Sequence, residues 1–248
     1  LYIRLKIEET PVFRQALDAA KPVRVPVRDA LSAQWRQILL VAGMLSALFG
    51  FFYIATVFVT GYAGRNPKGV PPGILGFSTT TILTVQIFAA MVFFGTIALT
   101  AMYSDRIGRR RVVLFGTAFG IPMGLFAIPV MNQGGTAAFA AGVFMLLAIV
   151  GLAYGPLAAF LPELFDTRYR YTGAGLGYNL GGVLGGAIPI LVANEMLREW
   201  GSNSIGYYLA GLATLSTLCV LALPETKAAD LSVEPATVRV PVPAGASV

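Results

Sequence analysis

The sequence predicts an all-α membrane protein with six transmembrane helices, and three observations support this fold class. Of its 248 residues, 56% are hydrophobic and 12% are charged, with a mean hydropathy of +0.72. This composition leaves too little polar surface to solvate a globular chain. Six stretches reach the roughly 20 apolar residues that a helix needs to cross a bilayer. They are continuous apolar runs without the alternation of a β-barrel strand.

The chain divides into three parts. Residues 1–34 are predicted to be the end of a truncated helix followed by a cytoplasmic linker, because an apolar start gives way to basic residues and prolines. A short surface helix is expected near residues 11–20. Residues 35–223 form the transmembrane part, and residues 224–248 form a cytoplasmic tail. The tail is rich in proline, so we expect it to be disordered.

The six predicted spans follow one another with short connections. In order they are residues 38–62, 79–102, 112–131, 137–161, 173–197 and 205–223. Charged residues are nearly absent from them, as expected when each costs about 2.5–3.5 kcal/mol at a helix centre. Trp35 and Trp200 stand at span borders, where amphipathic aromatic rings prefer to lie.

Glycines and prolines predict how the spans pack and bend. Small residues at intervals of four let another backbone approach closely, and two spans carry such a series: Gly173, Gly177, Gly181 and Gly185 in one, and Gly116, Gly120 and Gly124 in the other. We expect packing surfaces there. Pro156 and Pro189 are expected to mark bends.

The distribution of basic residues predicts the orientation in the membrane. Residues 103–111 place one Asp and four Arg in a predicted turn between two spans. Cytoplasmic loops carry the excess of Lys and Arg, and placing this turn inside puts fifteen of the eighteen Lys and Arg on that side. The chain is therefore expected to be a multi-pass protein of the cell (inner or plasma) membrane with both ends cytoplasmic. The net charge of +6 reflects this topology, so no nucleic-acid partner is expected.

Two features of composition exclude most kinds of enzyme. The chain has no histidine, which excludes a Ser-His protease, a His-ligated haem and a zinc site of the usual type. Its single cysteine, Cys219, lies in the last span and is expected to be apolar filler. We therefore expect no enzyme, no catalytic or metal-binding residue and no cofactor.

The charged turn carries a resemblance to a known family. Residues 104–111, Ser-Asp-Arg-Ile-Gly-Arg-Arg-Arg, resemble the D-R-x-G-R-R motif of the major facilitator superfamily. Three further segments, residues 35–56, 161–173 and 224–227, add a resemblance to its metabolite:proton symporter family. The resemblance runs from residue 1 to about residue 227 and covers only the second half of such a transporter.

This resemblance implies a fold, a mechanism and partners. Residues 35–223 would be a six-helix transmembrane half-domain, helices 7 to 12, whose partner is a missing N-terminal six-helix half. The complete protein would carry small organic metabolites such as carboxylates or zwitterionic osmolytes, with protons, by alternating access in the lipid bilayer. The alternative that the residues leave open is a self-associating six-helix channel or scaffold.

Two charged turns are candidates for gating. The resemblance implies that Asp105, Arg106, Gly108, Arg109 and Arg110 form a contact that holds one conformation closed; otherwise the arginines only anchor the topology. A second turn contains the charged residues Glu163, Arg168 and Arg170. It is expected either to form a salt-bridge network with the first turn or to be a solvated loop.

Polar side chains at membrane depth are candidates for the substrate cavity, because each is costly there unless it faces a cavity or a partner. These candidates are Tyr53, Gln86, Tyr154, Tyr178 and Asn179. Their alternative roles are hydrogen bonding between helices for the amides and packing for the tyrosines. No ionisable residue lies in the middle of a span, so the group that couples transport to protons is expected in the missing half.

Overall fold

The six predicted spans are confirmed as helices. The computed structural model describes residues 26–64, 75–166 and 168–226. The first span comprises α3 (Pro26–Tyr53), the π-helix η1 (Ile54–Phe58) and α4 (Val59–Ala63). The other five comprise α5 (Thr79–Ile107), α6 (Arg109–Met131), α7 (Gly135–Tyr154) with α8 (Leu157–Glu163), α9 (Arg170–Gly182) with the π-helix η2 (Val183–Ala187) and α10 (Ile188–Trp200), and α11 (Asn203–Ala222). The helix expected near residues 11–20 and the tail beyond residue 226 lie outside the described residues.

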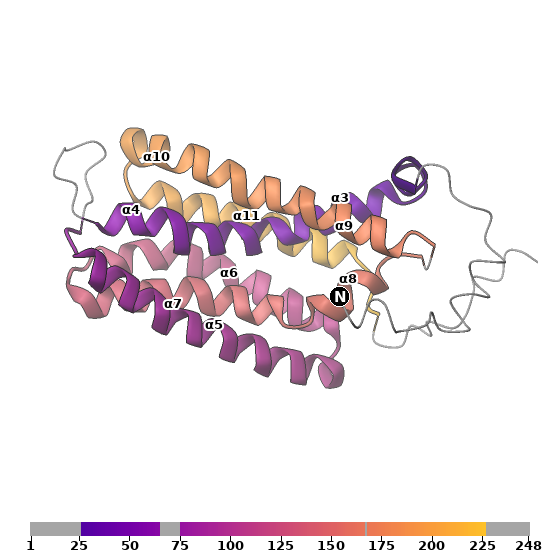
Figure 1. Ribbon diagram of the computed structural model, residues 1–248, viewed down its shortest axis with the longest axis horizontal. Helices are drawn as coiled ribbons and strands as arrows, with labels where there is room; N and C mark the ends of the chain where they lie inside the picture. The colour runs from indigo at the N-terminus through magenta and orange to yellow at the C-terminus, as the bar shows by residue number, and fades with distance from the viewer. Residues whose placement is uncertain (1–25, 65–74, 167, 227–248) are drawn as a thin grey trace, which may run out of the picture.

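The long helices lie side by side along one axis (Figure 1). The start of α3, the corner between α5 and α6, and the end of α11 lie together at the right of the view. The end of α4 and the connection between α6 and α7 lie at the opposite end. An even number of crossings thus brings residues 26 and 226 to the same end of the bundle.

The first span is the central helix. Of its apolar window, 72% is buried, against 17% for α5 and 28% for the span that runs from Arg170 to Trp200. Phe51, Met44 and Leu45 of α3 are almost fully buried. The outward surfaces of α5 and of the fifth span are apolar and uncovered, so they must meet lipid or further protein.

The glycine series pack against neighbouring helices, as the sequence predicts. A Cβ atom added at Gly181 would come within 2.7 Å of Leu45 Cβ on α3. One added to Gly124 of α6 would come within 2.9 Å of the Ala210 backbone nitrogen on α11. Only a residue without a side chain permits such close approach of backbones.

The charged turn is shorter than the sequence predicts. Residues 103–111 are helical except for Gly108, because α5 runs to Ile107 and α6 begins at Arg109. Gly108 has a φ of 113°, a conformation that side chains with a Cβ rarely adopt. One glycine thus reverses the chain, and the flanking arginines are presented on helix ends.

Changes in helix type lie at or beside the two prolines where bends are expected. α7 ends at Tyr154 and α8 begins at Leu157, so the fourth span is interrupted at Gly155 and Pro156. Pro189 falls in the first turn of α10, directly after η2. The sequence pattern did not predict the two π-helices, η1 and η2. α3 begins at Pro26, inside the predicted linker, and has a kink at Gln34.

Candidate functional site

A cluster of charged side chains lies where α5 meets α6. We call it the charged cluster: it comprises the charged residues Asp105, Arg109, Arg110, Glu163 and Glu225 together with the hydroxyl group of Thr226. The elements that carry these residues meet at the right of Figure 1: α5, α8 and α11 end there, and α6 begins there. The cluster therefore joins three segments that are far apart in the sequence.

Arg109 connects the first charged turn to the second. Its guanidinium forms an ion pair with Glu163, and Nη2 also lies 3.3 Å from Asp105 Oδ1. The side chains of Arg109 and Glu163 are only 21% and 11% exposed. Glu163 Oε2 in turn accepts a hydrogen bond from Thr226 Oγ1 at 2.6 Å. The corner of α5 and α6 is thereby fastened to the end of α8 and to the segment after α11.

Arg110 binds the carboxyl end of α11. Its Nε donates to the Val220 carbonyl at 3.0 Å, and its Nη2 donates to the Leu221 carbonyl at 2.6 Å. The last carbonyls of a helix have no partner within the helix and carry partial negative charge, so a guanidinium satisfies them well. Arg110 thus acts inside this six-helix unit.

Glu225 performs the complementary role at the start of α6. Its Oε1 accepts from the backbone N–H groups of Arg110 at 3.3 Å and Thr226 at 3.2 Å. The first N–H groups of a helix favour a carboxylate. A Cβ at Gly108 would lie 2.7 Å from Glu225 Oε2, so this glycine also leaves room for the carboxylate. Glu225 was not among the predicted site residues, although the Pro-Glu-Thr-Lys sequence after the last span marks its position.

The predicted gating residues differ in how far they are exposed. The Asp105 side chain is 70% exposed, and Arg106 is exposed one residue further along α5. Arg168 is exposed and lies over the ring of Tyr169, with 5.4 Å between the guanidinium carbon and the ring centroid. Arg170, half-buried, is the first residue of α9. Asp105 is thus far more accessible to a second protein surface than Glu163, whose side chain is 11% exposed.

Three of the predicted cavity residues belong to one cluster of aromatic rings. This aromatic cluster comprises Tyr53, Tyr154 and Tyr178 with Phe49, Phe52 and Phe93. The hydroxyl groups of Tyr154 and Tyr178 are hydrogen-bonded at 3.1 Å. Its rings come from α3, α5, α7 and α9, and all six residues are at least partly exposed.

The two predicted amides lie elsewhere. Gln86 Nε2 donates to Thr60 Oγ1 at 2.9 Å and to the Thr56 carbonyl at 3.1 Å. Thr56 belongs to η1, so Gln86 supplies a side-chain donor to this π-helix, whose Thr56 carbonyl also accepts from the Thr60 hydroxyl at 2.7 Å. Asn179 is exposed, and its amide donates to the Gly175 carbonyl of its own helix at 2.8 Å. In this structure Gln86 therefore joins two helices.

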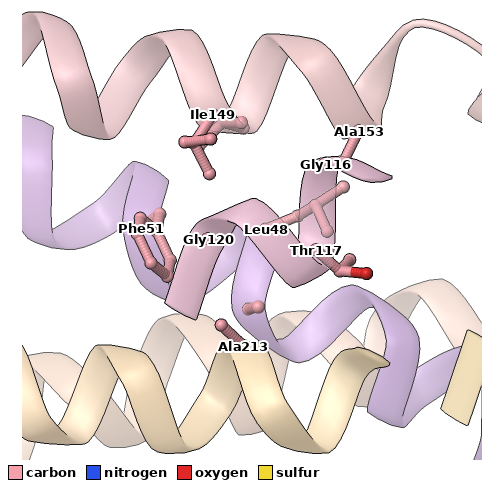
Figure 2. Close-up of a pocket in the computed structure, with 10 residues that line it drawn as sticks. Leu48, Phe51, Gly116, Thr117, Gly120, Ile149, Ala153 and Ala213 are labelled. Atoms are coloured by element: carbon pink, nitrogen blue, oxygen red, sulfur yellow. The ribbon is translucent and has the colours of Figure 1, made fainter. Parts of the chain in front are cut away.

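A small cavity in the middle of the bundle does not form a substrate site. It lies between α3, α6, α7 and α11, and Figure 2 shows Phe51, Gly116, Gly120 and Ile149 around it. Its volume of about 10 Å³ is close to that of one water-sized sphere. The Thr117 hydroxyl beside it donates to the Leu114 carbonyl, so it is satisfied locally. This cavity is a packing void.

Comparison with known proteins gives one consistent result. Residues 30–234 match the family described as "Sugar (and other) transporter". A Haemophilus influenzae relative named for metabolite transport is 34% identical over 237 residues, which cover 94% of this chain and 54% of the relative. The inner membrane metabolite transport protein YhjE of Escherichia coli is 31% identical, over 92% of this chain and 51% of its own length.

A more distant relative, the proline/betaine transporter of Escherichia coli, is 26% identical over 91% of this chain and 45% of its own length. The shikimate transporter of Escherichia coli is also 26% identical, over 92% of this chain and 52% of its own length. The chain thus spans about half the length of the curated relatives that it matches.

Proposed function

We propose that this chain, which belongs to the sugar (and other) transporter family of the major facilitator superfamily, is the C-terminal six-helix half of a secondary transporter. The complete protein carries small organic metabolites by alternating access, with the two halves rocking around a shared site. The match over 92–94% of the chain to transporters about twice as long favours this function over a self-associating channel or scaffold.

The observation that carries the proposal is the aromatic cluster. Four of the six spans contribute its rings, and it lies at the surface of this unit. Amphipathic side chains gathered from several helices at a partly exposed surface are what a substrate site between two halves requires. Tyr53, Tyr154 and Tyr178 are therefore our proposed substrate contacts.

The substrate class is proposed from the relatives' names together with the residues of the spans. Relatives named for proline, betaine and shikimate carry small carboxylates or zwitterions. Glu195 is the single charged residue in the six predicted spans, near the outer end of the fifth. We therefore propose proton-coupled transport in which the titrating group belongs to the N-terminal half.

The geometry of the charged cluster favours one role for Arg109 and Arg110 and a different role, in gating, for Asp105. Arg109 and Arg110 are already engaged with Glu163 and with the end of α11. Asp105, with its side chain 70% exposed, is the group that we propose contacts the N-terminal half in one conformation. In this proposal the cluster lies at the cytoplasmic face, and Arg109 holds Asp105 in place.

The test is uptake by the complete transporter, which contains this chain and the preceding six helices, in proteoliposomes. Labelled organic acids and zwitterions are offered with and without an inward proton gradient. We expect concentrative uptake of at least one class when the gradient is present. Ion currents without saturable uptake would instead support a channel, and no uptake of any compound would overturn the proposal.

A further inference from the structure

We propose that Ser216 of α11 is a positioning residue for transport: its hydroxyl group takes the place of one backbone hydrogen bond of α3 and so lets the first span bend at residues 43–47. The inference rests on the proposed transport function. It follows from the hydrogen bonds of two buried serines and from the close approach of α11 to α3 beside them.

The Ser216 hydroxyl bridges the two groups of one backbone pair. It accepts a hydrogen bond from the Ala47 N–H group at 3.0 Å and donates one to the Gly43 carbonyl at 2.8 Å. In a regular α-helix these two groups, four residues apart, bond to each other. A side chain that inserts at such a pair is one of the causes of helix bending.

A second hydroxyl group fills the remaining capacity of the Gly43 carbonyl. Ser46 Oγ donates to this carbonyl at 2.7 Å and lies 3.3 Å from Ser216 Oγ. A carbonyl oxygen has two lone pairs, and here both accept from serine hydroxyls. A serine that bonds back to its own helix also competes with the backbone bonds. Side chains therefore hold the helix together at Gly43 and Ala47.

The bridge lies where α3 and α11 approach each other closely. Ser46 and Ser216 are both fully buried. Gly43 and Gly50, two turns apart, face α11: a Cβ at Gly43 would collide with Cys219 Sγ, and one at Gly50 would collide with another side chain of α11. Such close approach is what brings the Ser216 hydroxyl to the backbone of α3.

The hydroxyl bridge favours the bent form of α3 over the straight one. Bending separates the Ala47 N–H group from the Gly43 carbonyl, and unsatisfied backbone groups are costly in a bilayer core, where no water replaces the lost bond. Ser216 satisfies both groups when they are apart. The bend lies between the cytoplasmic start of α3 and Tyr53, a proposed substrate contact at the end of this helix. Bending would thus move that contact relative to the cytoplasmic end.

The test compares Ser216→Ala with Thr217→Ala in the complete transporter. Thr217 is the matched control, because its hydroxyl donates to the Ala213 carbonyl of its own helix at 2.7 Å. We expect Ser216→Ala to lower the maximal rate of uptake in proteoliposomes at least about fivefold, since the bent form loses its bridging hydrogen bonds. Its melting temperature should fall by no more than about 2 °C, because the straight helix forms its own backbone bond. Thr217→Ala should change neither quantity.

Hydrogen exchange of the backbone amides separates a bend from a purely structural role. Amide exchange reports local opening of a helix. In Ser216→Ala, exchange in the peptide that contains Ala47 should slow at least about threefold, because the helix closes on its own bond and opens less often. Loss of a purely structural hydrogen bond would instead speed this exchange and lower the melting temperature.

The possible results separate this inference from the proposed function. Faster exchange in Ser216→Ala, or an uptake rate equal to that of Thr217→Ala, would overturn the inference while the proposed function stands. Absence of any uptake by the unaltered transporter would overturn the proposed function, and with it the role of Ser216 in transport.

Discussion

At the scale of single residues, the corner between α5 and α6 depends on a glycine and an ion pair. Gly108 adopts a φ of 113° and leaves room for the Glu225 carboxylate. Arg109 and Glu163 form a largely shielded pair with 21% and 11% exposure of their side chains. We derive one prediction about the stability of the protein from the glycine and another from the ion pair.

Gly108→Ala is expected to destabilise the protein by about 2 kcal/mol or more, because it combines backbone strain with a contact against Glu225. Gly135→Ala is the matched control: Gly135 also has a positive φ, 80°, but a Cβ there meets nothing within 4 Å. It should cost only the strain, about 1 kcal/mol. Unfolding of the complete transporter in detergent measures both, and equal losses would contradict a role for the Glu225 contact.

Glu163→Gln is expected to cost about 1–3 kcal/mol, because it leaves the Arg109 guanidinium shielded without its carboxylate. Glu195→Gln breaks the pair with Arg198, whose atoms are 3.2 Å apart but whose side chains are 63% and 57% exposed. That change should cost no more than about 0.5 kcal/mol. Chemical unfolding of both variants makes the comparison, and a Glu163→Gln loss as small as the control's would argue against the charged cluster as a structural fastening.

At the scale of elements, close helix contacts and π-helices determine the packing. The fifth span approaches α3 through its glycine series, and a Cβ at Gly185 in η2 would collide with the Ser46 carbonyl oxygen. Gln86 of α5 donates to the carbonyl and hydroxyl groups beside η1. Both π-helices therefore lie where another element makes a specific contact.

Gly185→Ala is expected to destabilise the protein by several kcal/mol, because a fixed backbone oxygen occupies the space that the methyl group needs. Gly175→Ala, on the same span, meets nothing within 4 Å and should be neutral or stabilising by up to about 1 kcal/mol. Thermal unfolding of the two variants in detergent is the measurement. A tolerated Gly185→Ala would mean that the fifth span can move away from α3 at little cost.

At the scale of the whole molecule, orientation and gating concern the complete transporter of which we propose that this chain is one half. Both ends of the described chain lie at one end of the bundle, and the charged cluster lies there too. The excess of Lys and Arg predicts that this end is cytoplasmic. The uncovered apolar surface of α5, whose window is 17% buried, is available to lipid or to the other half.

The orientation can be measured with single cysteines. After Cys219→Ser removes the native thiol, Arg168→Cys should react with an impermeant thiol reagent only from the cytoplasmic side. Arg198→Cys, at the opposite end of the fifth span, should react from the outside. Labelling of intact cells and inverted vesicles distinguishes the two sides, and the reversed pattern would contradict the predicted topology.

Asp105→Asn is expected to lower the rate of uptake at least about tenfold, because it removes the exposed carboxylate that we propose binds the N-terminal half. Its fold stability should change little, since the bond with Arg109 is exposed. Glu195→Gln is the control, because Glu195 is a carboxylate of similar exposure, 63% against 70%, at the other end of the bundle. Unchanged uptake in Asp105→Asn would exclude this residue from gating.

The sequence alone determined the class, the six spans and the family motif, because apolar length, charge position and glycine spacing act locally along the chain. It indicated Tyr53, Tyr154 and Tyr178 as separate polar side chains in three spans. Only the tertiary structure decided that they join Phe49, Phe52 and Phe93 in one cluster, whereas Gln86 bonds to the first span. It likewise decided that Glu225, 115 residues from Arg110, completes the charged cluster. Contacts between distant segments depend on helix rotation and on close approach at glycines, and neither can be read from hydrophobic pattern.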